Sequence, residues 1–121
     1  MGKKILILDD SESIREVVSF TLANAGHDVQ KAVDGDDALK QLDGTAYDLI
    51  ITDLHMPNKN GIELIREVRK MDTYKFIPIL FLTTESQTEK KKEAKEAGAT
   101  GWIVKPFVPD KLLAAINKVV R

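Results

Sequence analysis

The sequence has no cysteine, only one tryptophan and no long apolar run. The lack of cysteine excludes disulfides and cysteine-based metal sites. The apolar run that follows Lys4 has four residues before two aspartates, too few for a signal peptide or a membrane span. The formal net charge of −1 gives no overall attraction to nucleic acid or to anionic membranes. We therefore expect a cytoplasmic protein that binds neither nucleic acid nor membrane.

The composition is that of an ordinary globular domain, with 43% hydrophobic and 31% charged residues. A chain of 121 residues is long enough for one core and short for two. No linker or low-complexity segment divides it. We expect a single domain over residues 1–121, with no attached output domain.

Short apolar runs alternate with helical patterns along the chain. Apolar runs predict strands near residues 5–8, 48–53, 78–82 and 101–104, and a more polar strand, as expected of a sheet edge, is predicted near residues 28–33. Helices are expected between and after them: one capped by Ser13 or Ser11 and ended by Gly26, a short one ended by Gly44, one opened by Gly61, one from Gln87 to Ala97, and one capped by Asp110. This alternation is typical of an α/β fold, a parallel sheet with helices on both faces.

Polar side chains follow the buried runs where each predicted strand ends. Parallel strands bring their carboxyl ends to one edge of the sheet, where open α/β sheets bind ligands. The residues at these ends are Asp9 and Asp10, Asp53, Thr83, and Lys105.

Three carboxylates at one edge cannot all be ionised without a compensating charge. Ligation by oxygen alone, without His or Cys, favours Mg²⁺. An aspartate beside Mg²⁺ and a lysine can attack a phosphoryl group without a general base, while Lys105 and Thr83 stabilise the phosphoryl oxygens. Singly, each residue has a more ordinary interpretation, such as a helix cap or a surface charge. Their joint placement at the strand ends is what favours a site.

Over nearly its whole length the chain resembles the receiver domain of bacterial two-component response regulators. The resemblance rests on Asp9-Asp10, on Asp53 followed by Met56-Pro57 and Gly61, on Thr83, and on Lys105-Pro106-Phe107. It implies a flavodoxin-like (βα)5 three-layer sandwich, with a five-stranded parallel sheet of order 2-1-3-4-5 and helices on both faces.

The resemblance also implies a role for each site residue. Asp53 would accept a phosphoryl group from a histidine kinase or a small phosphodonor. Asp10 and Asp53 would hold Mg²⁺ together with the backbone carbonyl of His55, and Asp9 would act through a metal-bound water.

For the remaining residues, the resemblance implies that Lys105 pairs with the phosphate and that Thr83 moves toward it. A cis bond is expected before Pro106. The family's switch aromatic is usually Tyr or Phe, but here it is Trp102, whose indole donates a hydrogen bond and cannot accept one. Trp102 is therefore interpreted either as a switch residue with Thr83 or as a core or interface aromatic.

His55 and the helix expected over residues 87–97 leave further alternatives open. His55 either controls water access to the phosphoaspartate or is a solvated loop residue. The segment from Thr83 to Gly101 has no large apolar side chain, so this helix offers the core only alanines. We expect it to change on phosphorylation and to form, with the Trp102 strand and the last helix, the docking face for kinase and target; a solvated face with Glu–Lys pairs is the alternative.

The favoured function is a phosphorylation-activated switch, most similar to chemotaxis-type receivers, that is not a conventional enzyme but promotes its own phosphorylation and dephosphorylation. We expect a monomer or a weak phosphorylation-dependent dimer. Alternatives are a phosphorelay intermediate or a receiver excised from a larger regulator. A phosphorylation-dead scaffold would normally lack one of the key site residues, and none is missing here. A small Mg²⁺-dependent phosphohydrolase would need an acid where His55 stands. A flavodoxin-like electron carrier would need a phosphate loop, where Asp9-Asp10-Ser11-Glu12 would repel phosphate.

Overall fold

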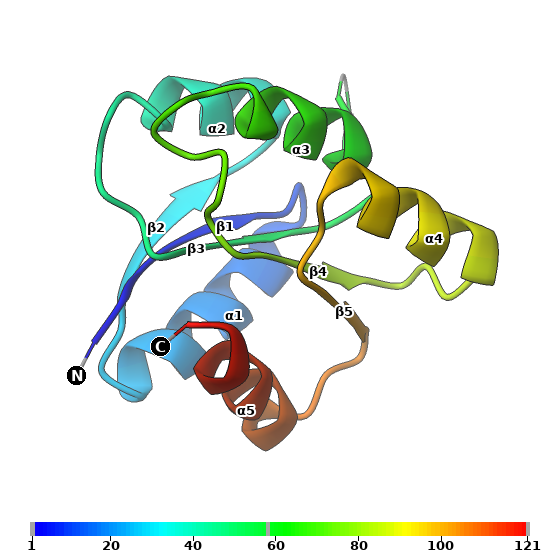
Figure 1. Cartoon of the computed structure of the whole chain (residues 1–121). Helices are drawn as coiled ribbons and strands as arrows, with labels where there is room; N and C mark the ends of the chain where they lie inside the picture. Colours follow the sequence, from blue (N-terminus) through cyan, green and yellow to red (C-terminus); the bar gives the residue numbers. More distant parts are fainter. Residues whose placement is uncertain (1, 58, 121) are drawn as a thin grey trace.

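The computed structural model describes residues 2–57 and 59–120, so Met1, Asn58 and Arg121 lie outside the described residues. Within these residues, strands and helices alternate through the chain (Figure 1). The elements are β1 Lys4–Leu8, α1 Glu12–Asn24, β2 Asp28–Ala32, α2 Gly35–Gln41, β3 Leu49–Thr52, α3 Gly61–Arg69, β4 Ile79–Thr83, α4 Thr88–Ala97, β5 Gly101–Val104 and α5 Pro109–Val119.

All strand pairs are parallel, and the order across the sheet is β2-β1-β3-β4-β5. Ile5 of β1 pairs with Val29 on one side and with Leu49 on the other, so β1 lies inside the sheet. This position explains the continuous apolar sequences of β1 and β3, because a strand covered on both faces needs apolar residues at every position. The predicted order and the parallel sheet are confirmed.

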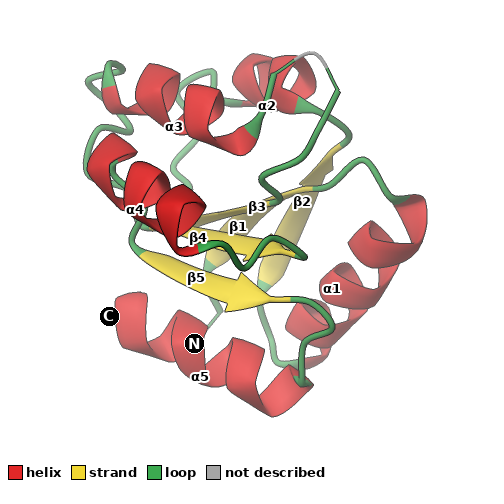
Figure 2. Ribbon diagram, turned by 90° about the vertical axis from the view of Figure 1, so that its right-hand side faces the viewer, coloured by secondary structure: helices red, strands yellow, loops and turns green. Residues whose placement is uncertain are grey.

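Helices cover both faces of the sheet (Figures 1 and 2). Successive residues of a strand point to opposite faces. Ile5 and Ile7 belong to a core cluster that also includes Val18 and Leu22 of α1 and Leu112 and Ile116 of α5. Leu6 and Leu8 belong to a second cluster, with residues of α2, α3 and α4. The three predicted layers are therefore present, and the core consists of two clusters, one on each face of the sheet.

The structure decides between two capping residues for α1 and corrects the one expected for α5. Ser11, not Ser13, caps α1, since its hydroxyl accepts the Ile14 N–H at 3.3 Å. The prediction that Asp110 caps α5 is wrong, because that helix begins at Pro109 and its N-cap residue is Val108. Proline suits the first helical position, where no N–H is needed, so Asp110 lies within the first turn, near the positive end of the helix dipole.

Helix α4 is weakly attached, as its sequence predicts. Ala94 is its only buried residue among those described, and Gln87 at its N-cap makes no side-chain capping bond. By contrast, α3 buries five residues and begins with a capping box between Asn60 and Glu63. Among the described residues, no helix has the combined length and hydrophobicity that crossing a bilayer requires.

Candidate functional site

The carboxyl ends of the central strands bring the predicted residues together. Asp9 directly follows β1 and Asp53 directly follows β3, and the Asp53 N–H donates to the Leu8 carbonyl at 3.1 Å. At the other side of the site, the Lys105 N–H donates to the carbonyl of Thr83 at 2.8 Å. These backbone bonds continue the strand pairing by one residue, so the sheet itself sets the spacing of the side chains.

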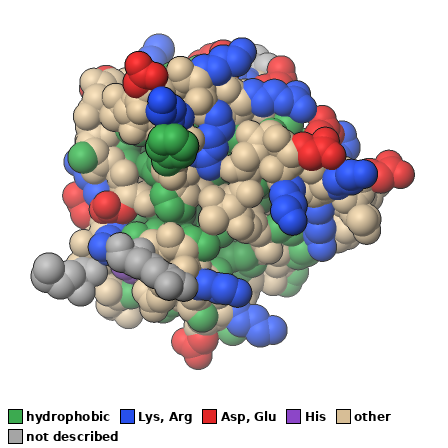
Figure 3. Space-filling view, viewed as in Figure 1, with side chains coloured by type: hydrophobic (Ala, Val, Ile, Leu, Met, Phe, Trp, Pro, Cys, Tyr) green, Lys and Arg blue, Asp and Glu red, His purple; other side chains and the backbone are tan. Residues whose placement is uncertain are grey.

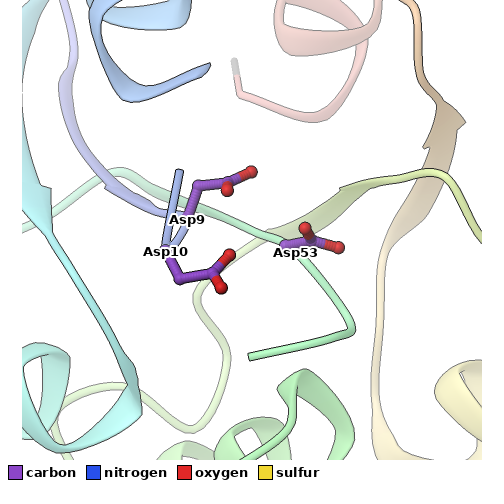
Figure 4. A group of neighbouring side chains, drawn as sticks. All are labelled: Asp9, Asp10 and Asp53. Atoms are coloured by element: carbon purple, nitrogen blue, oxygen red, sulfur yellow. The ribbon is translucent and has the colours of Figure 1, made fainter. Parts of the chain in front are cut away.

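Asp9, Asp10 and Asp53 form an acidic cluster, in which each offers a carboxylate oxygen within 4.8 Å of the others (Figure 4). Asp9 and Asp53 are buried, with 5% and 8% of their surface exposed, whereas Asp10 is exposed. The donor set consists of hard oxygens, which Mg²⁺ prefers, and one exposed member leaves a route from solvent. The cluster therefore fits a divalent cation.

Lys105 is the cation that the cluster already contains. Its ammonium donates to Asp9 Oδ2 at 2.8 Å and to Asp53 Oδ2 at 3.0 Å, and only 9% of its side chain is exposed. Burial alone would lower the pKa of Lys105, but the hydrogen bonds and charges of Asp9 and Asp53 outweigh it and raise that pKa above the ordinary value. Lys105 therefore stays charged and holds the two aspartates together. The peptide bond between Lys105 and Pro106 is cis, as expected.

Each buried aspartate has one oxygen on Lys105 and the other on a backbone N–H. Asp9 Oδ1 accepts the N–H of Ser11 at 2.9 Å, and Asp53 Oδ1 accepts the N–H of His55 at 3.3 Å. Both carboxylates are thus fixed in orientation before any ligand arrives. The expected coordination of Mg²⁺ by the backbone carbonyl of His55 stays a prediction.

Thr83 is completely buried at the end of β4. Its hydroxyl accepts the N–H of Glu85 at 3.3 Å, which shapes the start of the loop that leads to α4. It is not the N-cap of α4, which is Gln87, so its ordinary interpretation as that cap is wrong. Its action on a phosphoryl group stays a prediction.

Trp102 and His55 both contact the loop that follows Thr83. The indole N–H of Trp102 donates to the Glu85 carbonyl at 3.0 Å, and its ring packs against Phe81 with centroids 5.1 Å apart. His55 Nε2 lies 3.0 Å from Glu85 Oε1, although 60% of the histidine side chain is exposed. The Gln87 N–H and then His55 lower the pKa of the Glu85 carboxyl. His55 is exposed, as expected for a solvated loop residue, but its imidazole also contacts Glu85 in the loop after β4.

One contact with the cluster was missed from the sequence. Arg15 of α1 donates from Nη1 to the backbone carbonyl of Asp9 at 2.7 Å. In the sequence it resembles any charged residue on the polar side of an amphipathic helix. The available signal was its position four residues after Ser11, because a side chain there points back toward the strand end that precedes the helix.

Comparisons with known proteins agree on one family. A family model described as the response regulator receiver domain matches residues 5–117. The transcriptional regulatory protein DltR of Streptococcus agalactiae is 38% identical over 120 residues, which is 98% of this chain but only 52% of DltR. The chain thus spans about half the length of that relative.

Solved structures agree over the whole fold. The chemotaxis protein CheY4 of Vibrio cholerae is 48% identical, with a TM-score of 0.95, over 99% of this chain and 100% of that one. The receiver domain of the sensor histidine kinase PA1611 of Pseudomonas aeruginosa is 25% identical, with a TM-score of 0.90 over 98% of both chains. In that structure, a magnesium ion is coordinated in the active-site cleft.

Proposed function

The chain belongs to the response regulator receiver domain family of two-component systems, and on this premise we propose that Asp53 is its phosphoacceptor. The observation that carries the proposal is the pairing of Lys105 with both Asp53 and Asp9, at 3.0 and 2.8 Å, inside a cluster of three carboxylates. This arrangement gives Asp53 a carboxylate of fixed orientation with a cation beside it. The family match also favours this function over the phosphohydrolase and electron-carrier alternatives.

Phosphorylation would proceed by direct displacement. A carboxylate oxygen of Asp53 forms a bond to phosphorus while the bond to the donor breaks, either P–N of a phosphohistidine or P–O of an acyl phosphate. The electron pair leaves with that nitrogen or oxygen. Loss of the phosphoryl group follows by attack of water, which releases inorganic phosphate and restores the carboxylate. The protein thus promotes its own phosphorylation and dephosphorylation without being a conventional enzyme.

Asp10 and Asp53 are the proposed direct ligands of Mg²⁺, with the His55 carbonyl, and Asp9 acts through a bound water. The chemistry that Mg²⁺ supplies when bound is neutralisation of charge on the phosphoryl oxygens. Lys105 offers its ammonium to the same oxygens, and the Thr83 hydroxyl donates a hydrogen bond to one of them. Support for the metal comes from the oxygen-only cluster and from the magnesium site of the PA1611 receiver domain.

The proposed output is a change in binding to another protein, in chemotaxis, within a cytoplasmic single-domain switch. The similarity to CheY4 over its full chain supports this over a phosphorelay intermediate, and the match to half of DltR keeps a receiver of a larger regulator as the second candidate. We propose a monomer whose dimer, if formed, is weak and phosphorylation-dependent.

The proposed docking face for kinase and target consists of α4, β5 and α5. A groove between α4 and β5 is lined by Lys91, Ala94, Lys95 and Trp102, among others. Figure 3 shows basic side chains, with acidic ones among them, over the region of α4. Replacing Lys91 and Lys95 by glutamate should slow phosphotransfer from a histidine kinase while leaving reaction with acetyl phosphate unchanged. Equal loss with both donors would argue against docking there.

The test of the phosphoacceptor is incubation with acetyl phosphate, or beryllofluoride, with and without Mg²⁺. We expect a Mg²⁺-dependent change in Trp102 fluorescence with either reagent and, with acetyl phosphate, a mass gain of one phosphoryl group at Asp53. Asp53→Asn should abolish both, whereas Asp72→Asn, at a fully exposed site on the α3–β4 loop, should not. No Mg²⁺-dependent response together with no mass gain would overturn the proposal.

A further inference from the structure

We infer that Arg15 is a positioning residue for the magnesium site, acting through the peptide group that joins Asp9 to Asp10. The inference rests on the proposed function, since it concerns the same cation. Its basis is one contact: Arg15 Nη1 donates to the backbone carbonyl of Asp9 at 2.7 Å. Arg15 itself is partly buried in the second turn of α1.

The carbonyl that Arg15 contacts belongs to the peptide group that joins two members of the acidic cluster. The peptide group is planar, so the plane formed by the Asp9 carbonyl and the Asp10 N–H sets the direction of both flanking Cα atoms. Asp9 and Asp10 project their carboxylates from those two atoms into the cluster. A rotation of this one plane would therefore move two members of the cation site relative to Asp53.

The Asp9 carboxylate is held by Ser11 and Lys105, but the nearest backbone bonds belong to neighbouring peptides, because this peptide lies between a strand and a helix. The Asp9 N–H reaches the Ala32 carbonyl at 3.4 Å, a long bond that ends the β1–β2 pairing. The next backbone bond along the chain is the first of α1, from the Arg15 N–H to the Ser11 carbonyl at 3.0 Å. Arg15 thus closes the turn twice, with its backbone on Ser11 and with its guanidinium on Asp9.

The guanidinium of Arg15 also has an effect that would weaken Mg²⁺ binding. A positive charge next to the acidic cluster opposes a divalent cation by Coulomb repulsion. If charge alone mattered, removal of Arg15 would tighten Mg²⁺ binding. If positioning dominates, as we infer, removal weakens Mg²⁺ binding, because contacts that orient metal ligands typically contribute about tenfold or more to affinity.

Calorimetric titration with Mg²⁺ separates the two effects. Arg15→Met removes both charge and donor and should raise the Kd for Mg²⁺ about tenfold. Arg15→Lys keeps the charge and a donor and should restore most of the affinity. Arg66→Met is the matched control, since it removes the same charge from α3, where Arg66 lies 3.8 Å from Glu93, and should leave the Kd unchanged.

A readout of the turn itself excludes a general loss of stability. The amide signal of Ser11, whose N–H is bonded to Asp9 Oδ1, should shift in Arg15→Met and return in Arg15→Lys. Should Arg15→Met fail to fold, Arg15→Gln, whose shorter side chain does not reach the carbonyl, is judged by the same criterion. Unchanged or tighter Mg²⁺ binding by a folded variant overturns the inference alone. Absence of Mg²⁺ binding by the wild type overturns the proposed magnesium site and this inference with it.

Discussion

Trp102 is hydrogen-bonded to Glu85, with 3.0 Å between the indole nitrogen and the backbone carbonyl oxygen. Glu85 in turn donates its N–H to the hydroxyl of Thr83. One residue of the loop therefore joins the aromatic side chain of β5 to the threonine at the end of β4. An indole can make this bond because only a donor is needed, and its larger ring also fills space against Phe81.

Replacing Trp102 by phenylalanine tests this connection. The aromatic contact with Phe81 is kept in part, but the Glu85 carbonyl loses its donor. We expect a loss of about 1–2 kcal/mol in the free energy of unfolding, from the hydrogen bond and the smaller ring. We also expect faster amide exchange over residues 84–87. Urea denaturation and hydrogen exchange measure the two effects, and unchanged exchange over these residues would show that Trp102 does not hold the loop.

The difference between α3 and α4 predicts a difference in local stability. Helix α3 buries Ile62, Leu64, Ile65 and Val68 in addition to Gly61, whereas α4 buries Ala94. A helix with few buried contacts opens at low free energy. Amides of residues 84–97 should therefore exchange faster than those of α3, and beryllofluoride should change their protection more. Equal protection of the two helices would contradict the idea that α4 is the part that responds to phosphorylation.

The strands and the acidic cluster could be predicted because both depend on local patterns with a single structural outcome. A buried parallel strand requires a continuous apolar run, and the residue after it must lie at the sheet edge. Asp9, Asp53 and Lys105 were found in this way, without knowledge of any distance. The helix ends were harder, because Asp110 and Ser13 are good capping residues at positions where Pro109 and Ser11 determine the start.

Contacts between distant segments were missed for a different reason. Tyr74 is buried in the segment between α3 and β4, and its hydroxyl donates to the carbonyl of Thr45 at 2.7 Å. Arg69 donates to the carbonyls of Ile77 and Gly98, each at 2.6 Å. A long side chain that bonds to backbone carbonyls leaves no pattern in the sequence, since any residue can supply the acceptor. For Arg15, the one available signal was its position four residues after Ser11, which places it near the end of β1.

Lys105 should give stability a distinctive dependence on pH in protein freed of divalent cations. Its pKa is raised above the ordinary 10.5, since the bonds to Asp9 and Asp53 outweigh the effect of burial. A raised pKa in the folded state means that the contribution is complete below 10.5 and is lost as the pH rises through the folded-state value. The stability difference between wild type and Lys105→Met should therefore be constant below pH 10.5 and shrink as the pH rises further.

Chemical denaturation at a series of alkaline pH values measures this difference. Lys40→Met, at an exposed position on α2, controls for the loss of a lysine that lies outside the cluster. A gap between wild type and Lys105→Met that widens with increasing pH would have the wrong sign and would show that the ammonium does not stabilise the folded state through Asp9 and Asp53.

Replacement of Asp10 by asparagine should affect the apo protein and the metal complex in opposite directions. Asp10 is the exposed member of a cluster that also contains Asp9 and Asp53. Without cation, removal of a like charge relieves repulsion, which is worth about 1 kcal/mol for two charges about 4 Å apart in water. With cation, a ligand is lost. We expect Asp10→Asn to have the higher thermal midpoint in EDTA, to gain less stability from added Mg²⁺ than the wild type does, and to react slowly with acetyl phosphate.

Thermal unfolding with and without Mg²⁺ measures both changes in one experiment. Asp72→Asn, at its fully exposed position, should change neither midpoint, and an Asp10→Asn variant that gains as much from Mg²⁺ as the wild type would remove Asp10 from the set of ligands.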